Sequence, residues 1–405
     1  MDLPYLTTAL PPIPLRFKVS PADFIVEEIP RFDPCGSGDH VYVLIEKVGR
    51  TTRQAVNALA RALSVPAEHI GVAGQKDAEG LTRQYLSVLG AEPARIQTLA
   101  LPQITILGVA RHRAKLRLGD LKGNRFQLRL RGVDAARLPD LAAVLDVLTR
   151  RGVPNYFGPQ RFGMRGDTWM IGSALLRGDF EEAVACIAGR PLDTDPEAIR
   201  AARSLMATKQ FPEAARAWPA GFEHCRVLCR RLAGGNAKRA VLSLDRRLLG
   251  FYVSAWQARI FNQVVAERLP RLDEVLAGDV VVSHATGALE LVRDPARFKS
   301  AAAAFEMSAT GPLPGFAMPN ANGQPGALEA RMVAAHNLAL TDLPRTGPLK
   351  CIGGRRPVRF KPEELSWDTG TDERGGFVAL CFTLPAGCYA TSLLREVGKA
   401  ELREG

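Results

Sequence analysis

Two regions of alternating polar and apolar residues, separated by a long helical middle, most constrain the fold of this chain. Residues 23–29 and 40–48 each place every second apolar side chain on one face, as half-buried strands do. From about residue 164 the sequence becomes rich in alanine and arginine at helical spacing. Strand-like alternation returns only near Val358 and at 377–384. The pattern predicts a mixed α+β unit at the start of the chain and a second, helical domain in the middle.

A helix and a short strand are predicted between the first strands and residue 77. Thr51 and Thr52 offer N-caps, and Pro66 ends a helix whose apolar residues follow the i, i+3, i+4, i+7 spacing: Val56, Leu59, Ala60 and Leu63. Residues 70–72 then form a short strand that leads to Gly-Gln-Lys-Asp at 74–77. A rigid strand end can aim a loop side chain, so Asp77 is well placed for chemistry.

The basic stretch from Arg111 to Arg131 holds eight Lys or Arg against the single acid Asp120. We expect two strands here, at 115–118 and 125–131, joined through 119–123 and presenting one apolar and one basic face. Such a density of positive charge favours a polyanion as partner. The alternative is a basic face that is merely solvated.

The composition is that of a folded protein in a reducing compartment. The chain has 405 residues, 46% of them hydrophobic, and a net charge of +11. No leader is recognisable in the first 20 residues, and no apolar run approaches the length of a membrane span. Seven cysteines, an odd number, predict a cytoplasmic location. His224, Cys225 and Cys229 lack a fourth ligand nearby, so no metal site is expected.

Asp77 alone would most simply make an Asx-type turn, but three further segments change that interpretation. They are LKGNRF at 121–126, NYFGPQRFG at 155–163 and LPAGCYAT at 384–391. Together with Gly-Gln-Lys-Asp, in this order, they resemble the TruD family of tRNA pseudouridine synthases. The resemblance starts at Arg16-Phe17-Lys18, ends near Glu396 and is weak between about 170 and 340.

The resemblance implies a pseudouridine synthase core, a mixed β-sheet with a central cleft, interrupted by a large α/β insertion. The core would comprise residues 1–154 and 348–405, with the insertion (TRUD) domain at 155–347. The segment 155–163 would either contact RNA or shape the junction into the insertion. A second basic cluster on the return to the core is suited to phosphate contacts: Arg355, Arg356, Arg359 and Lys361.

The resemblance also assigns site residues. Asp77 matches the catalytic aspartate, and Lys18 matches the position of a cation close to it, which would hold the carboxylate ionised. Three residues match positions that contact the target nucleotide: Phe24, Asn124 and Tyr389. Phe126 is a further candidate for stacking on the base, although it shares the apolar side of its strand with Leu128 and Leu130, which favours a place in the core over stacking.

The implied activity is the isomerisation of uridine 13 in the D-arm of transfer RNA. The uracil leaves its N-glycosidic bond, turns over and rejoins the ribose through C5, so a carboxylate near C1′ and C2′ is needed. No cofactor, metal or obligate protein partner is implied, and we expect a monomer that does not bind membranes. One alternative is a non-catalytic RNA-binding or RNA-chaperone protein. A nuclease is disfavoured because no carboxylate cluster or His pair suits two-metal chemistry.

Overall fold

The computed structural model describes residues 3–76 and 78–404, which form two compact units. The core unit comprises Tyr5–Val153 and Phe360–Gly405, and the middle unit comprises Met1–Pro4 and Pro154–Arg359. The chain passes between them at two short strands, β8 (Val153–Pro154) and β13 (Arg359–Phe360). Residues 348–359 were expected in the core but lie in the middle unit, because β12 (Gly354–Pro357) pairs with β11 (Met307–Leu313).

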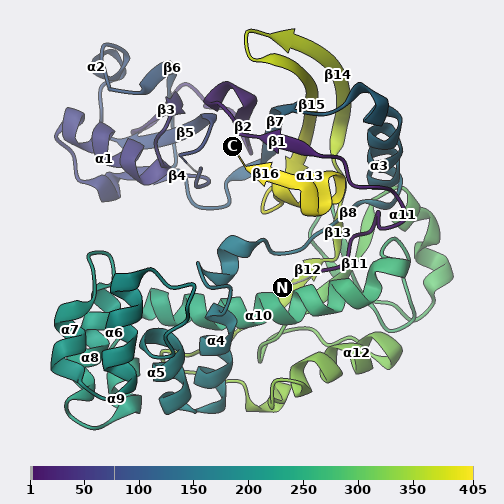
Figure 1. The fold of residues 1–405 in the computed structure, drawn as a ribbon. Coiled ribbons are helices and arrows are strands. Elements are labelled where there is room, and N and C mark those ends of the chain that lie inside the picture. Colours follow the sequence, from purple (N-terminus) through teal and green to yellow (C-terminus); the bar gives the residue numbers. More distant parts are fainter. Residues whose placement is uncertain (1–2, 77, 405) are drawn as a thin grey trace. The chain divides into compact units, whose positions relative to one another are not determined.

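The core unit is built on a ten-stranded mixed β-sheet (Figure 1). Seven strands follow the order β14-β15-β7-β2-β5-β3-β6, while β4 pairs with β5, and β1 pairs with β7 and β16. The β2–β5 and β1–β16 pairs are parallel, and the other pairs described are antiparallel. The strands are β1 (Leu15–Phe17), β2 (Phe24–Pro30), β3 (His40–Val48), β4 (Ile70–Val72), β5 (Leu81–Leu89), β6 (Ile104–His112), β7 (Leu121–Arg131), β14 (Glu363–Asp372), β15 (Gly375–Pro385) and β16 (Leu402–Glu404).

Helices bury the apolar residues of this sheet in two separate clusters. The helices are α1 (Thr52–Leu63), α2 (Pro93–Gln97), α3 (Leu138–Arg151) and α13 (Ala390–Gly398). Apolar residues of α1 pack with those of β3, β5 and β6. Apolar residues of α3 and α13 pack with those of β2, β7 and β15. The core unit thus has two hydrophobic clusters. β2 contributes to one and β5 to the other, and these two strands are hydrogen-bonded neighbours in the sheet.

The predicted strands at 23–29, 40–48 and 70–72 are confirmed as β2, β3 and β4. The predicted helix is confirmed as α1, which begins as expected because the Thr51 side chain accepts a hydrogen bond from the Gln54 N–H. It ends before Pro66 is reached. Ser64, in the left-handed conformation at φ 58°, terminates it.

The predicted strand at 115–118 is wrong. The strand before β7 is β6, which ends at His112 and pairs with β3 rather than with β7. Residues 115–118 instead form a loop in which the Leu116 N–H donates to Ser87 Oγ at 2.9 Å. Leu116 is buried and Leu118 is exposed. The alternating pattern at 115–118 therefore reflects one buried residue that anchors a loop, and not the apolar face of a strand.

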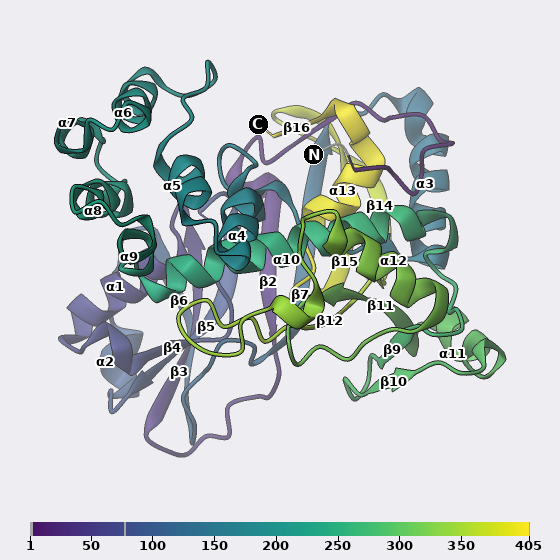
Figure 2. The same cartoon turned by 90° about the horizontal axis from the view of Figure 1, so that it is seen from below.

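The middle unit combines helices with a four-stranded sheet of order β10-β9-β11-β12. Its longest helix, α10 (Arg246–Arg268), runs through the unit (Figure 2), and it buries a stripe formed by Val253, Trp256, Ile260 and Val264. The helices are α4 (Thr168–Arg177), α5 (Phe180–Ala188), α6 (Glu197–Ala207), α7 (Phe211–Ala217), α8 (Glu223–Leu232), α9 (Ala237–Leu242), α10 (Arg246–Arg268), α11 (Lys299–Ala303) and α12 (Gly323–Ala334). The remaining strands are β9 (Val280–Ser283) and β10 (Leu289–Leu291). Among the described residues, no helix is long and apolar enough to cross a membrane.

Asn155 and its neighbours hold the start of the middle unit. The Asn155 side-chain N–H donates to the carbonyl of Pro357 at 2.9 Å, and the Arg356 guanidinium hydrogen-bonds to Asn155 Oδ1. The backbone of Phe157 exchanges two hydrogen bonds with the Asn262 amide, at 2.8 and 2.9 Å. These buried contacts favour the junction role for the segment 155–163 over direct contact with RNA.

Candidate active site

The backbone that leads to Asp77 is anchored to the start of α1. Asp77 itself lies outside the described residues. The Lys76 N–H donates to Thr52 Oγ1 at 2.7 Å, and the Thr52 N–H donates to the Lys76 carbonyl at 3.2 Å. The Thr52 hydroxyl in turn donates to Gln84 Oε1 of β5 at 2.8 Å. All three residues are buried, so the peptide before Asp77 is held in one place.

The Lys76 side chain links the same loop to β2 and β7. Its ammonium lies 2.5 Å from Asn124 Oδ1 and 3.3 Å from Glu28 Oε2. Glu28 and Asn124 face each other in the pairing of β2 with β7. The Lys76 and Glu28 side chains are only 7% and 1% exposed, so this is a buried ion pair. Residues from three places in the sequence therefore converge at Lys76, the residue that precedes Asp77 in the sequence.

Because both side chains are buried, the charged form of each depends on the charge of the other. Burial raises the pKa of the Glu28 carboxyl, against the charge of Lys76 and the hydrogen bond from the Tyr85 N–H. Burial likewise lowers the pKa of the Lys76 ammonium, against the charge of Glu28. A buried charge left without its partner is strongly destabilising. The pair should therefore be sensitive to the loss of either member.

Lys18 contacts the segment that follows Asp77. Its ammonium lies 2.9 Å from Glu79 Oε2 and also pairs with Glu404 of β16. Burial lowers the pKa of Lys18, but the hydrogen bonds and charges of the two glutamates outweigh it and raise the pKa overall. Lys18 is thus a cation held against Glu79, which lies two residues along the chain from Asp77. Its expected closeness to the aspartate stays a prediction.

Phe24 begins β2 beside the same segment. Its ring centroid lies 5.1 Å from Lys18 Nζ, and its side chain is nearly buried. A Cβ on Gly80 would come within 2.5 Å of the Phe24 carbonyl oxygen, and Gly80 has a φ of +127°. Only glycine fits such a close approach in this conformation. The chain after Asp77 is therefore packed directly against Phe24.

Phe126 belongs to the core. It is 6% exposed, its ring stacks on Phe382 with a centroid distance of 5.3 Å, and it meets Phe24 edge-on at 6.2 Å. The proposed stacking of Phe126 on a flipped base does not fit this position, because its ring is covered by protein. Of the two alternatives, the structure favours the core role, in which Phe126 supports Phe24.

Tyr389 is the exposed aromatic residue among the predicted contacts. It is 43% exposed and precedes α13 as its N-cap residue. The preceding strand, β15, pairs Leu384 with Asn124 and Pro385 with Gly123. The turn that carries Tyr389 is thus attached to β7 beside Asn124. Its ring is accessible for contact with a nucleotide.

The loop and strand residues described above can be compared with those of known proteins. A family model described as tRNA pseudouridine synthase D (TruD) matches residues 1–397. The chain belongs to the TruD family. Two relatives named tRNA pseudouridine synthase D, from Geobacter metallireducens and Geotalea daltonii, are 43% and 40% identical to it over 400 and 402 residues. The alignments cover 98% of this chain in both cases, and 97% and 100% of the relatives.

The fold comparison agrees with the family. The crystal structure of a Methanosarcina mazei protein assigned as tRNA pseudouridine synthase D matches with a TM-score of 0.84 and 28% identity. The match covers 98% of this chain and 99% of the other. The predicted family and the predicted α+β fold class with a mixed sheet are thereby confirmed.

The basic stretch of this TruD chain is partly neutralised within the core unit. Arg131 pairs with Asp23 at 2.6 Å and with Asp372 at 2.7 Å, and Arg129 pairs with Asp372 at 3.0 Å. These two arginines are therefore not free for phosphate, contrary to the predicted basic face. Among the residues that the structure describes, four others in this stretch have no ion pair: Arg113, Lys115, Arg117 and Lys122.

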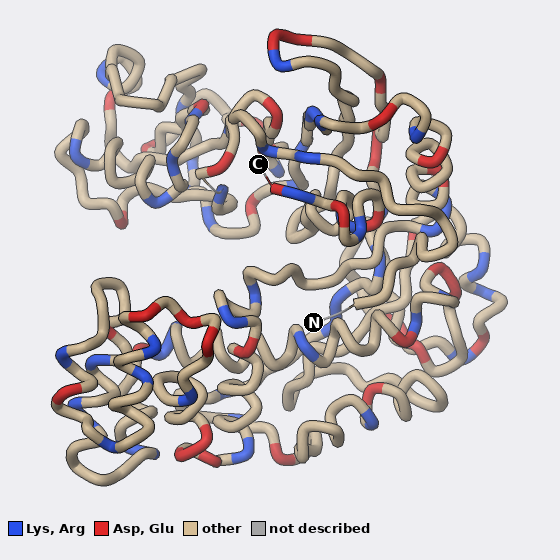
Figure 3. Tube along the Cα trace, in the orientation of Figure 1, with Lys and Arg blue, Asp and Glu red and all other residues tan. Residues whose placement is uncertain are grey.

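The predicted second basic cluster is wrong as a phosphate site. Arg355 forms a buried ion pair with Glu329 at 2.7 Å, and its side chain is fully covered. Arg359 is also buried and donates to the carbonyl of Ala302 at 2.6 Å. Arg356 is hydrogen-bonded to Asn155. Figure 3 shows positive and negative residues interspersed along the TruD chain, which agrees with internal pairing of many arginines.

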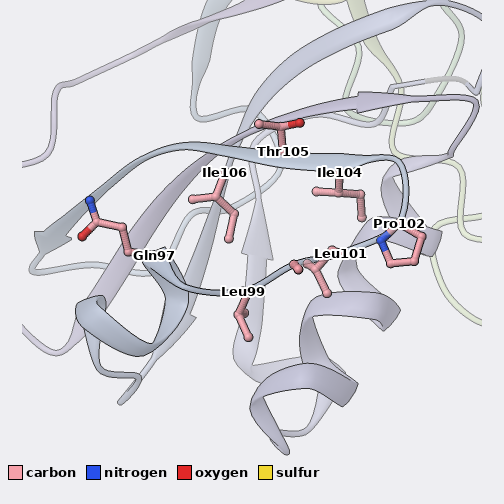
Figure 4. A pocket seen from close by; sticks show the side chains of 8 residues that line it. Gln97, Leu99, Leu101, Pro102, Ile104, Thr105 and Ile106 are labelled. Carbon is pink, nitrogen blue, oxygen red and sulfur yellow. The ribbon is translucent and has the colours of Figure 1, made fainter.

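An open hollow of about 510 Å³ in the core unit is a poor candidate for the active site. It lies between the end of α2 and β6, where Leu99, Leu101, Ile104 and Ile106 line it (Figure 4). None of its lining residues is ionisable. It therefore offers no group for the acid–base or nucleophilic chemistry of a TruD enzyme.

Sequence reasoning missed Glu28, Thr52, Gln84 and the role of Lys76. Glu28 shares the inward face of β2 with Phe24 and Val26, and Gln84 shares the inward face of β5 with Leu86 and Val88. A polar residue at an inward position of a strand is the signal that could have identified both, because buried polar groups need partners.

Proposed function

We propose that the chain isomerises uridine 13 in the D-arm of transfer RNA to pseudouridine, with Asp77 as the catalytic carboxylate. Membership in the TruD family supports a tRNA pseudouridine synthase. The observation that carries the proposal is the anchoring of the chain on both sides of Asp77. Lys76 is fixed by Thr52, Glu28 and Asn124, and Gly80 is packed on Phe24. A carboxylate held on such a rigid frame suits catalysis.

The reaction breaks the C1′–N1 bond of the uridine and forms a C1′–C5 bond. The proton at C5 is released and N1 gains a proton, so no atom is oxidised or reduced. Asp77 would either attack C1′ or remove the C2′ proton, and both routes need its ionised form. Lys18, already charged through Glu79 and Glu404, would help to keep Asp77 ionised.

Asn124 would read the uracil through its amide N–H groups. The Lys76 ammonium has only hydrogen-bond donors, so the amide atom facing it must be the acceptor Oδ1. This orientation leaves the Nδ2 group of Asn124 to donate toward a carbonyl oxygen of the base. Phe24 and Tyr389 would contact the flipped nucleotide, which offsets part of the unstacking free energy.

The proposal is tested with unmodified transfer RNA that carries tritium at uridine C5. Pseudouridine formation exchanges this tritium into water, and a second transcript with cytidine at position 13 tests the position. We expect release from the first RNA and none attributable to position 13 from the second. Equal release from both would contradict the choice of uridine 13 while leaving the synthase activity intact. No release from either would favour the non-catalytic RNA-binding alternative.

Binding of transfer RNA should depend on salt less steeply than the sequence suggests, because several arginines are paired internally. If about four phosphates are engaged, log K should fall with log salt at a slope of about −3. Filter binding between low and physiological salt measures the slope. A slope near zero would contradict binding through phosphate contacts. A slope of about −8 would show that the internal ion pairs open on binding.

Replacement of Tyr389 with alanine should lower turnover through loss of a ring that stacks on the base. Base–aromatic stacking is worth about 1–3 kcal/mol, so the loss should be about tenfold to a hundredfold. Tyr389→Phe keeps the ring face and should be much milder. The measurement is kcat/KM by tritium release for both variants. If Tyr389→Phe is as damaging as Tyr389→Ala, the hydroxyl matters and the stacking role is wrong.

A further inference from the structure

A partly open hollow of about 350 Å³ in the middle unit is lined mainly by three segments. α4, α10 and the residues after α12 line it, with α5 contributing Glu182 at its edge. α4 and α10 are closely packed, because a Cβ on Gly172 would lie 2.1 Å from the Tyr252 carbonyl oxygen. The walls are therefore fixed, and the volume lies within the range of small-ligand sites. Six residues carry its chemistry: Trp169, Ser173, Arg177, Arg259, Gln263 and His336.

The two arginines make the hollow electropositive. Within the part of the chain that the structure describes, neither Arg177 nor Arg259 forms an ion pair. Arg177 is held by Ser173 Oγ at 2.7 Å, which aims its guanidinium without neutralising it. The one acid in the lining, Glu182, pairs with Arg190 at 2.5 Å. Two positive charges therefore share this hollow with one acid whose charge is already matched.

Two polar atoms in the hollow are buried without a hydrogen-bond partner among the described residues. They are Nε of Arg259, a donor, and Oε1 of Gln263, an acceptor. The two residues are one helical turn apart on α10. Buried polar atoms in native proteins normally have partners, so these two residues have hydrogen-bonding capacity that the described residues leave unused.

The remaining wall is aromatic. The Arg259 guanidinium carbon lies 5.1 Å from the Trp169 ring centroid, and the His336 ring meets Trp169 edge-on at 5.2 Å. Burial first, and then the charges of Arg259 and Arg177, lower the pKa of His336 to about 4. At neutral pH His336 is therefore an uncharged hydrogen-bonding group. The hollow thus combines two cations with neutral polar groups and an indole.

We propose that this hollow binds the phosphate of a nucleotide, with Arg177 and Arg259 on the phosphate oxygens and Trp169 beside the ribose or base. Guanidinium groups bind phosphate with directed, charge-assisted hydrogen bonds. Gln263 and His336 add neutral hydrogen bonds that suit the hydroxyls of a ribose. The nucleotide belongs to the transfer RNA strand, an assignment that rests on the proposed function. A free mononucleotide has the same chemistry and is the other source to be tested.

The experiment compares Arg259→Gln and Arg177→Gln with the control Arg247→Gln. Arg247 lies on the same helix as Arg259, is exposed and is outside the hollow, so the control removes the same charge. Circular dichroism confirms that each variant is folded. The dissociation constant for unmodified transfer RNA is then measured by filter binding at several salt concentrations, and the binding of uridine monophosphate and inorganic phosphate by calorimetry.

Each hollow variant should weaken transfer RNA binding by about tenfold, as expected for the loss of one charged phosphate contact. The salt slope should become shallower by about one in the hollow variants and stay unchanged in Arg247→Gln. Weakening by Arg247→Gln to the same extent would overturn the proposal, because only overall charge would then matter. Uridine monophosphate binding that is lost in Arg259→Gln, with transfer RNA binding unchanged, would keep the phosphate site and assign it to a free nucleotide.

Unchanged binding of both transfer RNA and uridine monophosphate in the hollow variants would overturn the proposal altogether. These binding measurements do not depend on catalysis. Failure of the proposed isomerisation would therefore appear as absent tritium release, and failure of the phosphate site as unchanged affinity.

Discussion

We expect Asp77→Asn to abolish pseudouridine formation while folding and transfer RNA binding stay at wild-type levels. The amide keeps the shape of the carboxylate but lacks its charge and its basicity. Loss of an essential catalytic group lowers turnover by several powers of ten, so we expect at least about a thousandfold loss. Asparagine caps turns about as well as aspartate, so a purely structural role of Asp77 would survive the change.

No described acid beside Asp77 is free to replace it. Glu79 is paired with Lys18, and Glu28 is buried against Lys76. Tritium release is measured on purified Asp77→Asn protein, together with circular dichroism and filter binding. A matched Glu79→Gln variant also removes an acid close to Asp77 in the sequence. It should keep most of its activity, because Glu79 is paired with Lys18 and is not the proposed catalytic carboxylate. Release by Asp77→Asn at more than about a tenth of the wild-type rate would assign the chemistry to another residue.

Lys76→Met is expected to have the largest effect on stability. It leaves the Glu28 carboxylate buried without its cation, and breaking a buried pair in this way typically destabilises by about 3–5 kcal/mol. Urea denaturation followed by circular dichroism gives the free energy of unfolding. Lys122→Met serves as the control, since Lys122 is exposed on β7 and should change stability by less than about 0.5 kcal/mol.

A double variant separates the stability of the pair from its role in positioning. In Lys76→Met with Glu28→Gln no unpaired charge remains, so most of the lost stability should return. Turnover should stay low, because the amide of Asn124 has lost the donor that orients it. If the double variant regains both stability and wild-type turnover, Lys76 stabilises the fold and has no part in positioning Asn124.

The strands of the core were predictable because each carries its own pattern. The alternation at 40–48 and the spacing of apolar residues in α1 appear in the structure as expected. The pattern at 115–118 was misleading, because alternation over so few residues can also arise from one buried anchor such as Leu116. Short runs of alternation carry too little information to separate a strand from an anchored loop.

The polar network beside Asp77 could not be predicted in the same way, because it depends on which strands are neighbours. Glu28, Lys47 and Gln84 occupy inward positions on β2, β3 and β5, three adjacent strands of the sheet. All three lie within hydrogen-bonding or ion-pairing distance of residues 74–76. Single-strand patterns show that each is unusual, but only the strand order shows that they share one site.

The interrupted core also dictates the order in which the protein can fold during its synthesis. β7 pairs with β15, and β1 pairs with β16, although the whole middle unit separates the partners along the chain. A ribosome therefore releases the continuous segment Pro154–Arg359 before the first strands meet their partners. Until then the β7 edge stays open and prone to pairing with other chains. A nascent chain that stops before β15 would carry a complete middle unit and a core that cannot close.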